Sequence, residues 1–274
     1  MNRFILLLIA VILCAAPVCA QGLGGPSSSD QPIEITADKT LEWLRNDKQF
    51  IARDNAKAKQ GDVSIAAQTL TADYRDGDGS GLEIYKMKAT DNVVISSREN
   101  NAYGDMATYE VDQGLAVMTG DNLKMTSPDQ TLTARDKFEY WVTDGRLVAL
   151  GDAKIIRPKP TGGTDTLRSD KISALLKENA KGQRVLHSME AIGNVVITTP
   201  TEVITGAYGI YKADTNTAEI KGDVIIKRGP NILEGERAEV DMNTNTSRMF
   251  GSAKTGGQVR GVFYPNSEKK SGGQ

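Results

Sequence analysis

Residues 91–95 read Asp-Asn-Val-Val-Ile, and residues 193–197 read Gly-Asn-Val-Val-Ile. A third copy, Gly-Asp-Val-Ile-Ile, occupies residues 222–226. In each copy a turn-forming pair precedes a β-branched run that favours a strand. Four more variable copies start at residues 54, 120, 151 and 251. A motif that returns at intervals of roughly 30 to 40 residues is typical of folds built from repeated supersecondary units.

The sequence around these copies alternates apolar and polar residues, as in Ile33-Glu34-Ile35-Thr36 and Leu123-Lys124-Met125. Runs such as Arg45-Asn46-Asp47 and Thr143-Asp144-Gly145 are typical of turns between strands. Each unit is therefore expected to hold about two strands, with the small pair as a turn, so seven units predict about fourteen strands. Because a hairpin cannot bury its apolar face alone, the units must stack into a shared core. The sequence predicts an all-β antiparallel meander or jelly roll.

Two segments leave alternatives open within this pattern. Residues 172–181 have the composition of a helix, but their place in the repeat favours a strand. The Pro- and Gly-containing segment 157–164 could separate two halves, yet the repeat continues on both sides of it. We therefore expect a β domain over residues 32–150, followed over 151–264 by its continuation or by a second half of the same kind.

The N-terminus has the features of an export signal. Arg3 precedes an apolar run over residues 4–13, and Val18 and Ala20 occupy the −3 and −1 positions of a cleavage site before Gln21. Residues 1–20 are therefore interpreted as a cleaved signal peptide, with an uncleaved membrane anchor as the alternative. Both cysteines of the chain lie in this leader. Residues 21–31 are expected to be a flexible linker, and residues 265–274 a disordered tail.

Composition argues against most enzymes and against nucleic-acid binding. The formal net charge is −2, without the basic excess that nucleic acid requires. His187 is the only histidine, and no nucleophile–base pair, metal-ligand set or phosphate-binding loop can be named. Residues 76–81 match the first half of a calcium loop, but position twelve is Met87 instead of glutamate, so a hairpin turn is the better interpretation. We expect no catalytic residues, cofactor or metal.

Many positions expected to face inward are small, and aromatic residues make up only 5% of the chain. A close-packed sandwich core is the ordinary interpretation of such a sequence. A core of mostly alanine and valine would nevertheless be thinly filled for so many strands. The alternative is a groove between sheets that takes an apolar ligand.

Three stretches of this sequence resemble one family. They are Gln31-Pro32-Ile33-Glu34-Ile35-Thr36-Ala37-Asp38, Gln60-Gly61-Asp62-Val63-Ser64-Ile65-Ala66-Ala67, and Ala107-Thr108-Tyr109-Glu110-Val111. They are similar to the LptA/OstA-like family of periplasmic lipopolysaccharide-transport bridge proteins. The resemblance covers residues 31–75 and 103–140, and beyond these only the repeat carries it.

The resemblance implies a twisted, V-shaped jelly roll, open along one side, that holds the acyl chains of lipid A. It implies a bridge between inner-membrane and outer-membrane components of lipopolysaccharide transport, with copies joined head to tail. The lipid-facing positions that it implies are Ile33, Ile35, Val63, Ile65, Tyr109 and Val111. Ala56 and Ala58 are smaller than the resemblance implies, which bears on the width of the groove. The alternatives are an inner-membrane-anchored partner of the same fold and a secreted β-solenoid with a structural or carbohydrate-binding role.

Overall fold

The described part of the chain is all β. The computed structural model describes residues 32–264, apart from 78–80, 99, 161, 181, 183, 245 and 253–256. These residues form eighteen strands and no helix, and every strand belongs to one antiparallel sheet. The all-β antiparallel prediction is confirmed, with eighteen strands in place of about fourteen.

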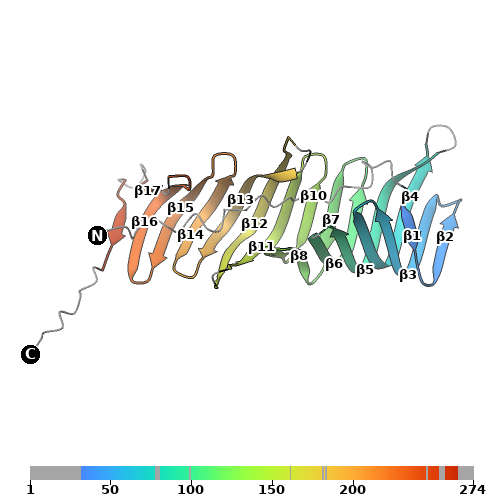
Figure 1. The fold of residues 1–274 in the computed structure, drawn as a ribbon, viewed down its shortest axis with the longest axis horizontal. Helices are drawn as coiled ribbons and strands as arrows, with labels where there is room; N and C mark the ends of the chain where they lie inside the picture. The colour runs from blue at the N-terminus through green and yellow to red at the C-terminus, as the bar shows by residue number, and fades with distance from the viewer. Residues whose placement is uncertain are drawn as a thin grey trace, which may run out of the picture.

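The bounds of the strands, in chain order, are β1 (Glu34–Thr36), β2 (Thr40–Leu44), β3 (Gln49–Gln60), β4 (Val63–Asp76), β5 (Leu82–Ser97), β6 (Asn100–Glu110), β7 (Leu115–Thr119), β8 (Leu123–Ser127), β9 (Gln130–Ala134), β10 (Lys137–Trp141), β11 (Arg146–Pro158), β12 (Thr164–Glu178), β13 (Arg184–Thr198), β14 (Val203–Lys212), β15 (Thr217–Arg228), β16 (Asn231–Asp241), β17 (Thr246–Phe250) and β18 (Arg260–Val262). The strands lie side by side along the long axis of the molecule (Figure 1).

Long strands form two blocks, β3 to β6 and β11 to β16, in which each strand pairs with the next one along the chain. Pairs of short strands flank these blocks. β1 and β2 both pair with β3, and β17 and β18 both pair with β16. Between the blocks, β7 and β10 join β6 to β11 at one end of the strands, and β8 and β9 join them at the other. One sheet therefore runs from β1 to β18.

β-Bulges near the middle of the long strands bend them. The register shifts between Thr90 and Val93 in β5 and between Ile192 and Val195 in β13. The pairs 91–92 and 193–194 fill these bulges, and all four residues have positive φ angles. Five of the pairs expected to be turns, at 54–55, 91–92, 151–152, 193–194 and 222–223, are therefore bulges inside single strands. Gly120-Asp121 lies in a turn between β7 and β8, as predicted, and residues 251–252 follow β17. Turns and bulges both favour residues that tolerate positive φ, so this local signal does not separate them.

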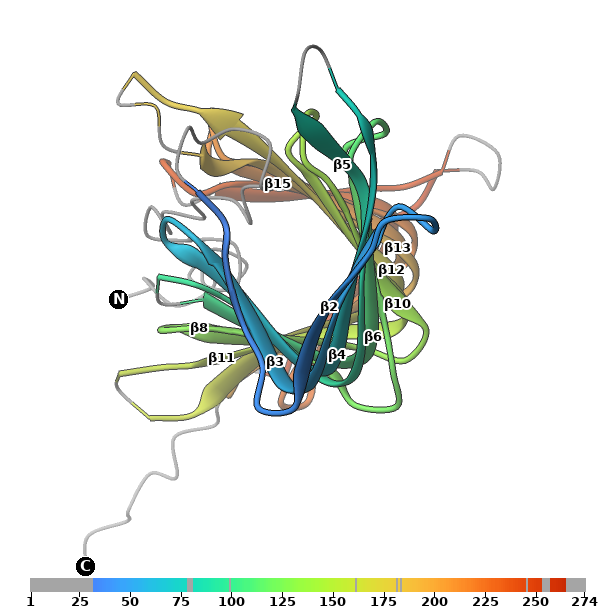
Figure 2. The same ribbon diagram turned by 90° about the vertical axis from the view of Figure 1, so that its right-hand side faces the viewer.

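The bulges divide the sheet into two walls. The first wall contains β2, β7, β10 and β17, and the second contains β1, β8, β9 and β18; the long strands cross from one wall to the other. In the view along the long axis the strands surround a central space (Figure 2). The V-shaped jelly roll expected from the resemblance is the architecture observed.

A carboxylate on the neighbouring strand supports the bulge. The Oδ2 atom of Asp170 accepts a hydrogen bond of 2.9 Å from Nδ2 of Asn194, and it lies where a Cβ on Gly193 would be. Asp38 accepts an equivalent bond of 2.8 Å from Asn55. Gly193 has a φ of +77°, so both its conformation and the space beside it favour glycine.

Of the remaining predictions of local structure, one is confirmed, one stays a prediction, and the others lie wholly or partly outside the described residues. Residues 164–178 form β12, so the strand interpretation of segment 172–181 is confirmed up to Glu178. Residues 150 and 151 both lie in β11, and the sheet continues without a break there; the division into two domains stays a prediction. In the segment 76–81, the amide of Gly77 donates to the carbonyl oxygen of Gly81 over 3.0 Å, but 78–80 lie outside the described residues. So do the predicted signal peptide 1–20, linker 21–31 and tail 265–274.

Candidate functional site

The pairing registers place apolar residues in three rows on the inner face of the sheet. Because residues directly opposite in an antiparallel pair share one face, each register extends a row by one strand. The deep row of the first wall consists of Leu41, Ala52, Leu70, Ala89, Ala107, Met118, Phe138, Ala149, Ile172, Ala191, Gly209, Ile220, Ala238 and Met249. It contains no charged side chain from β2 to β17.

The other two rows are almost as uniform. The outer row of the first wall consists of Trp43, Phe50, Ala72, Met87, Tyr109, Ala116, Tyr140, Leu147, Ala174, Met189, Tyr211, Ala218, Val240 and Ser247. The row of the second wall consists of Ile35, Ala58, Ile65, Ile95, Ala102, Met125, Leu132, Ile155, Leu167, Ile197, Ile204, Ile226, Leu233 and Gly261. Together the three rows form a trough along the whole sheet, which we call the apolar trough.

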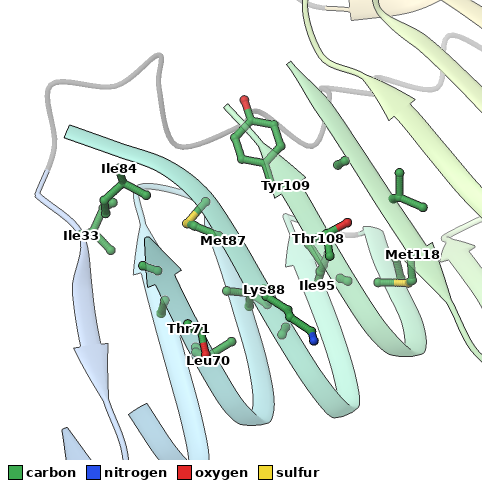
Figure 3. A pocket seen from close by; sticks show the side chains of 18 of the residues that line it. Ile33, Leu70, Thr71, Ile84, Met87, Lys88, Ile95, Thr108, Tyr109 and Met118 are labelled. Atoms are coloured by element: carbon green, nitrogen blue, oxygen red, sulfur yellow. The ribbon is translucent and has the colours of Figure 1, made fainter. Parts of the chain in front are cut away.

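The apolar trough is open in its N-terminal part, where it contains a cavity of about 120 Å³. Most of the side chains that line this cavity come from β3 to β7, and others come from β1, β2, β8, β10 and β11. Met87, Tyr109 and Met118 project into it (Figure 3). Alanines occupy many of the lining positions, including Ala58 and Ala102 on the second wall. The space that these small side chains leave is what keeps the cavity open.

Four of the six predicted site residues lie around this cavity. Ile33, Ile35, Ile65 and Tyr109 line it, so the structure brings together residues from β1, β4 and β6 and from the segment just before β1. Val63 lies outside it. It shares the face of Ile65 but is the first residue of β4, where its neighbours across the sheet are Gln60 and Ser97.

Val111 also lies outside the cavity, because β6 ends at Glu110. Its amide donates a hydrogen bond of 2.9 Å to the carbonyl oxygen of Tyr85 at the start of a turn. Alternation along a strand indicates which face a residue occupies, but not how far along the wall the trough extends.

The trough is nearly filled in its C-terminal part. The cavity between β12 and β15 measures only about 20 Å³. In the second-wall row, Ile155 of β11 and Ile204 of β14 occupy the positions that Ala58 of β3 and Ala102 of β6 occupy nearer the N-terminus. Ile204 has no exposed surface. The backbone is repeated, but the free space is not.

Thr71, Lys88 and Thr108 are the polar residues other than tyrosine among those that line the cavity (Figure 3), and the polar contacts described next lie at the edges of the trough. The Tyr140 hydroxyl accepts a hydrogen bond of 2.6 Å from Nη1 of Arg184, and burial raises the pKa of that hydroxyl although Arg184 opposes the shift. At the hairpin turns of the second wall, Nζ of Lys159 lies 2.9 Å from the buried carboxylate of Asp165. Burial also raises the pKa of Glu202, whose carboxylate lies 3.4 Å from Arg228. Most of the residues that line the cavity are apolar.

A larger hollow of about 340 Å³ lies near the C-terminal end of the sheet, and charged residues such as Lys212, Glu219 and Arg248 line it. Its mixed charge makes it a poor site for a hydrocarbon. Among the residues that the structure describes, no group of three His, Cys, Asp or Glu side chains is placed to hold a metal ion. In the same described ranges there is no helix with the length and hydropathy needed to cross a membrane.

Most of the trough could not be assigned from sequence. The predicted residues came from the motifs of β1, β4 and β6, whereas the alanines of β3, β5 and β6 complete the cavity. The sequence indicated these alanines through the high proportion of alanine at positions expected to face inward, such as Ala52 and Ala107. Small residues are equally frequent in a filled core, so only the pairing of strands shows where space remains.

Comparison with known proteins identifies the family. The family described as "LptA/(LptD N-terminal domain) LPS transport protein" matches the chain twice, over residues 34–146 and 136–246. No curated protein matches it. Among solved structures, the chain is similar to LptH from Pseudomonas aeruginosa, described as the LptA homologous periplasmic component of the lipopolysaccharide transport device. The identity is 11%, the TM-score is 0.21, and the alignment covers 86% of this chain and 96% of that one. From the two family matches, which span most of the sequence, the chain belongs to the LptA/LptD N-terminal family of lipopolysaccharide transport proteins.

Proposed function

We propose that this protein is a non-catalytic periplasmic carrier that shields the acyl chains of lipopolysaccharide while the lipid passes from the inner to the outer membrane. The observation that carries the proposal is the apolar trough, whose three rows run along the sheet from β1 and β2 to β17 and β18. Membership of a lipopolysaccharide transport family supports the choice of lipid.

The energetics agree with this task. Removing one CH₂ group from water is worth about 0.8 kcal/mol, so an acyl chain of about a dozen carbons gains on the order of 10 kcal/mol from an apolar site. A lipid of this kind needs a continuous apolar path to cross an aqueous compartment. The cavity between β3 and β7 is the part of the trough with room for hydrocarbon, and Ile35, Ile65 and Tyr109 are the proposed contacts.

The proposed partners are lipopolysaccharide, through lipid A, and components of the transport machinery in both membranes. Copies of the chain are proposed to join head to tail through the terminal strands, since an unpaired strand edge favours addition of another strand. Periplasmic location rests on the predicted signal peptide over residues 1–20. If the leader is retained as an anchor, the mature protein will begin at Met1, which mass spectrometry of the intact protein tests.

The open cavity supports this proposal over a solid structural or carbohydrate-binding module. Mass spectrometry of lipid that co-purifies with the protein from cells that make lipopolysaccharide tests it. We expect species that contain lipid A, at a level that falls when Tyr109 or Ile65 is replaced by aspartate. Recovery of no lipid from the folded protein, or of the same amount from the wild type and both variants, would contradict the proposal.

A further inference from the structure

The two ends of the sheet and its middle share one arrangement. At each end a long strand carries two short strands, β1 and β2 on β3, and β17 and β18 on β16. Within the described residues, none of these four short strands has a partner on its other side. In the middle, β6 carries β7 and β8 while β11 carries β10 and β9, and here the short strands pair with one another. We call this pairing of β7 with β10 and of β8 with β9 the seam.

The registers match as well. β2 pairs five residues with β3 across a four-residue turn, and β10 pairs five residues with β11 in the same way. Leu41 in β2 therefore corresponds to Phe138 in β10. By the same comparison of β17–β16 with β7–β6, Met249 corresponds to Met118. The N-terminal end repeats one side of the seam, and the C-terminal end repeats the other.

We propose that the seam is an internal copy of the junction between two successive molecules, and that it fixes the register of that junction. Phe138 lies opposite Met118 in the seam, so Leu41 of one copy pairs with Met249 of the next. On the second wall, Leu132 lies opposite Met125, so Ile35 pairs with Gly261. This inference rests on the head-to-tail assembly in the proposed function and specifies its geometry.

Exposure supports the correspondence. In the seam, Phe138 and Tyr140 are 3% and 4% exposed. Their counterparts at the free edge, Leu41 and Trp43, are 58% and 49% exposed, although their positions in the rows are the same. Large apolar side chains at an unpaired edge indicate a surface that another strand covers.

The charges at the junction and the orientation of the side chains toward the inner or outer face favour the same register. Glu139 lies opposite Val117 in the seam, and the corresponding residues at the ends are Glu42 and Arg248. The junction therefore places opposite charges across from each other on the outer face, which favours pairing. All three rows continue through it. A slip of one residue would bring Glu42 onto the inner face, against the apolar rows.

Disulfide crosslinking tests the register directly, because the only cysteines of the chain are at positions 14 and 19 of the leader. Opposite residues of an antiparallel pair are close enough for a disulfide, whereas residues that point to opposite faces are not. Leaderless protein with Glu42→Cys is mixed with protein carrying Arg248→Cys and oxidised. The matched control replaces Glu42→Cys by Leu41→Cys, which lies next to it on the inner face.

We expect at least tenfold more crosslinked dimer from the Glu42→Cys and Arg248→Cys mixture than from the control. Equal yields, or preferential linkage of two Glu42→Cys chains, would overturn the proposed register. A second measurement uses charge reversal. Glu42→Arg and Arg248→Glu should each lower the sedimentation coefficient of the assembly, and a mixture of the two should restore it; failure of the mixture to do so would also overturn the register.

The two proposals fail separately. Crosslinks in the proposed register without any co-purified lipid would contradict the carrier function and support the junction. If the Glu42→Cys and Arg248→Cys proteins do not crosslink but lipid that contains lipid A co-purifies, the junction is contradicted and the carrier function is supported. A thermal melt equal to that of the wild type checks that each variant is folded.

Discussion

The strands β3–β6, here the first copy, and the strands β11–β14, the second copy, build the same piece of sheet twice, with bulges at equivalent places. Among the described residues, the first copy lines a cavity of about 120 Å³ and the second copy one of about 20 Å³. On the first wall the two copies are nearly equal in size, with Leu70 matched by Ile172 and Tyr109 matched by Tyr211. On the second wall they differ. The repeated backbone therefore determines the path of the trough, while a few side chains on one wall determine how much space it leaves.

Ala58 and Ala102 in the first copy correspond to Ile155 and Ile204 in the second. The free space in the two copies therefore differs although their backbones are alike. The first copy has room for hydrocarbon, and the second is packed by its own side chains.

The largest effect is expected from Ile204→Ala. This side chain is fully buried, so its loss leaves a cavity and should lower the free energy of unfolding by about 2–5 kcal/mol. Ile95→Ala removes the same kind of side chain beside the open cavity, at the position that corresponds to Ile197, and should cost roughly half as much because Ile95 is only partly buried. Urea unfolding of both variants measures this. Equal losses would contradict the claim that the two copies differ in packing.

Filling the first copy should lower its capacity for lipid. In Ala58→Ile and Ala102→Ile, each new side chain takes the space of about three CH₂ groups, worth roughly 2 kcal/mol of lipid affinity per substitution. Titration with a fluorescent fatty acid measures the change, and we expect at least a tenfold loss for the double variant. Unchanged affinity in a variant that unfolds like the wild type would show that this cavity is not where lipid binds.

The bulges offer a smaller test of the same comparison. Gly193→Ala forces a side chain into a left-handed conformation and against the carboxylate of Asp170, and should cost about 1–2 kcal/mol of stability. At the equivalent bulge of the first copy, Asp91 already has a φ of 66°. Asp91→Gly should change stability by less than about 0.5 kcal/mol, because relief of strain offsets the entropy of glycine. Thermal unfolding compares the two; a larger effect at position 91 would contradict this account of the bulges.

The smallest effect concerns pH. Glu202, in the hairpin between β13 and β14, has a raised pKa because of burial, and the corresponding residue in the first copy is the neutral Asn100. A carboxyl group whose pKa is higher in the folded state stabilises the fold when protonated, and this contribution is lost as the pH rises through the raised value. The free energy of unfolding of the wild type should therefore decline from acidic toward neutral pH more than that of Glu202→Gln, which lacks this titrating group. Urea unfolding between pH 4 and about pH 8 measures the difference, and identical curves would contradict it.

The sequence predicted the fold class well because its signals are local. The alternation around Ile33 and the motif at residues 91 and 193 can both be recognised from residues that are adjacent in the sequence. The same locality explains the main error. Asp91-Asn92 satisfies the backbone requirement of a turn and of a bulge equally, and only the pairing of β5 with strands on both sides decides between them.

The site was predicted less completely for a related reason. The family resemblance implied Ile65, Tyr109, Val63 and Val111 alike as lipid-facing positions, and nothing in the sequence separated the first two from the last two by their depth in the trough. The cavity itself depends on what lies opposite a residue several strands away. Ala58 and Ala102 leave space because Ile65 and Ile95 between them do not fill it, and no sequence pattern records that relation.

Photocrosslinking tests the central claim, that the first copy holds acyl chains in the trough, most directly. A benzophenone amino acid at Tyr109 faces the cavity, and one at Glu110 projects from the opposite face of the same strand. In cells that make lipopolysaccharide, the account predicts a lipopolysaccharide adduct from position 109 and little or none from position 110. Adducts of equal yield from both positions, or an adduct from position 110 alone, would contradict it.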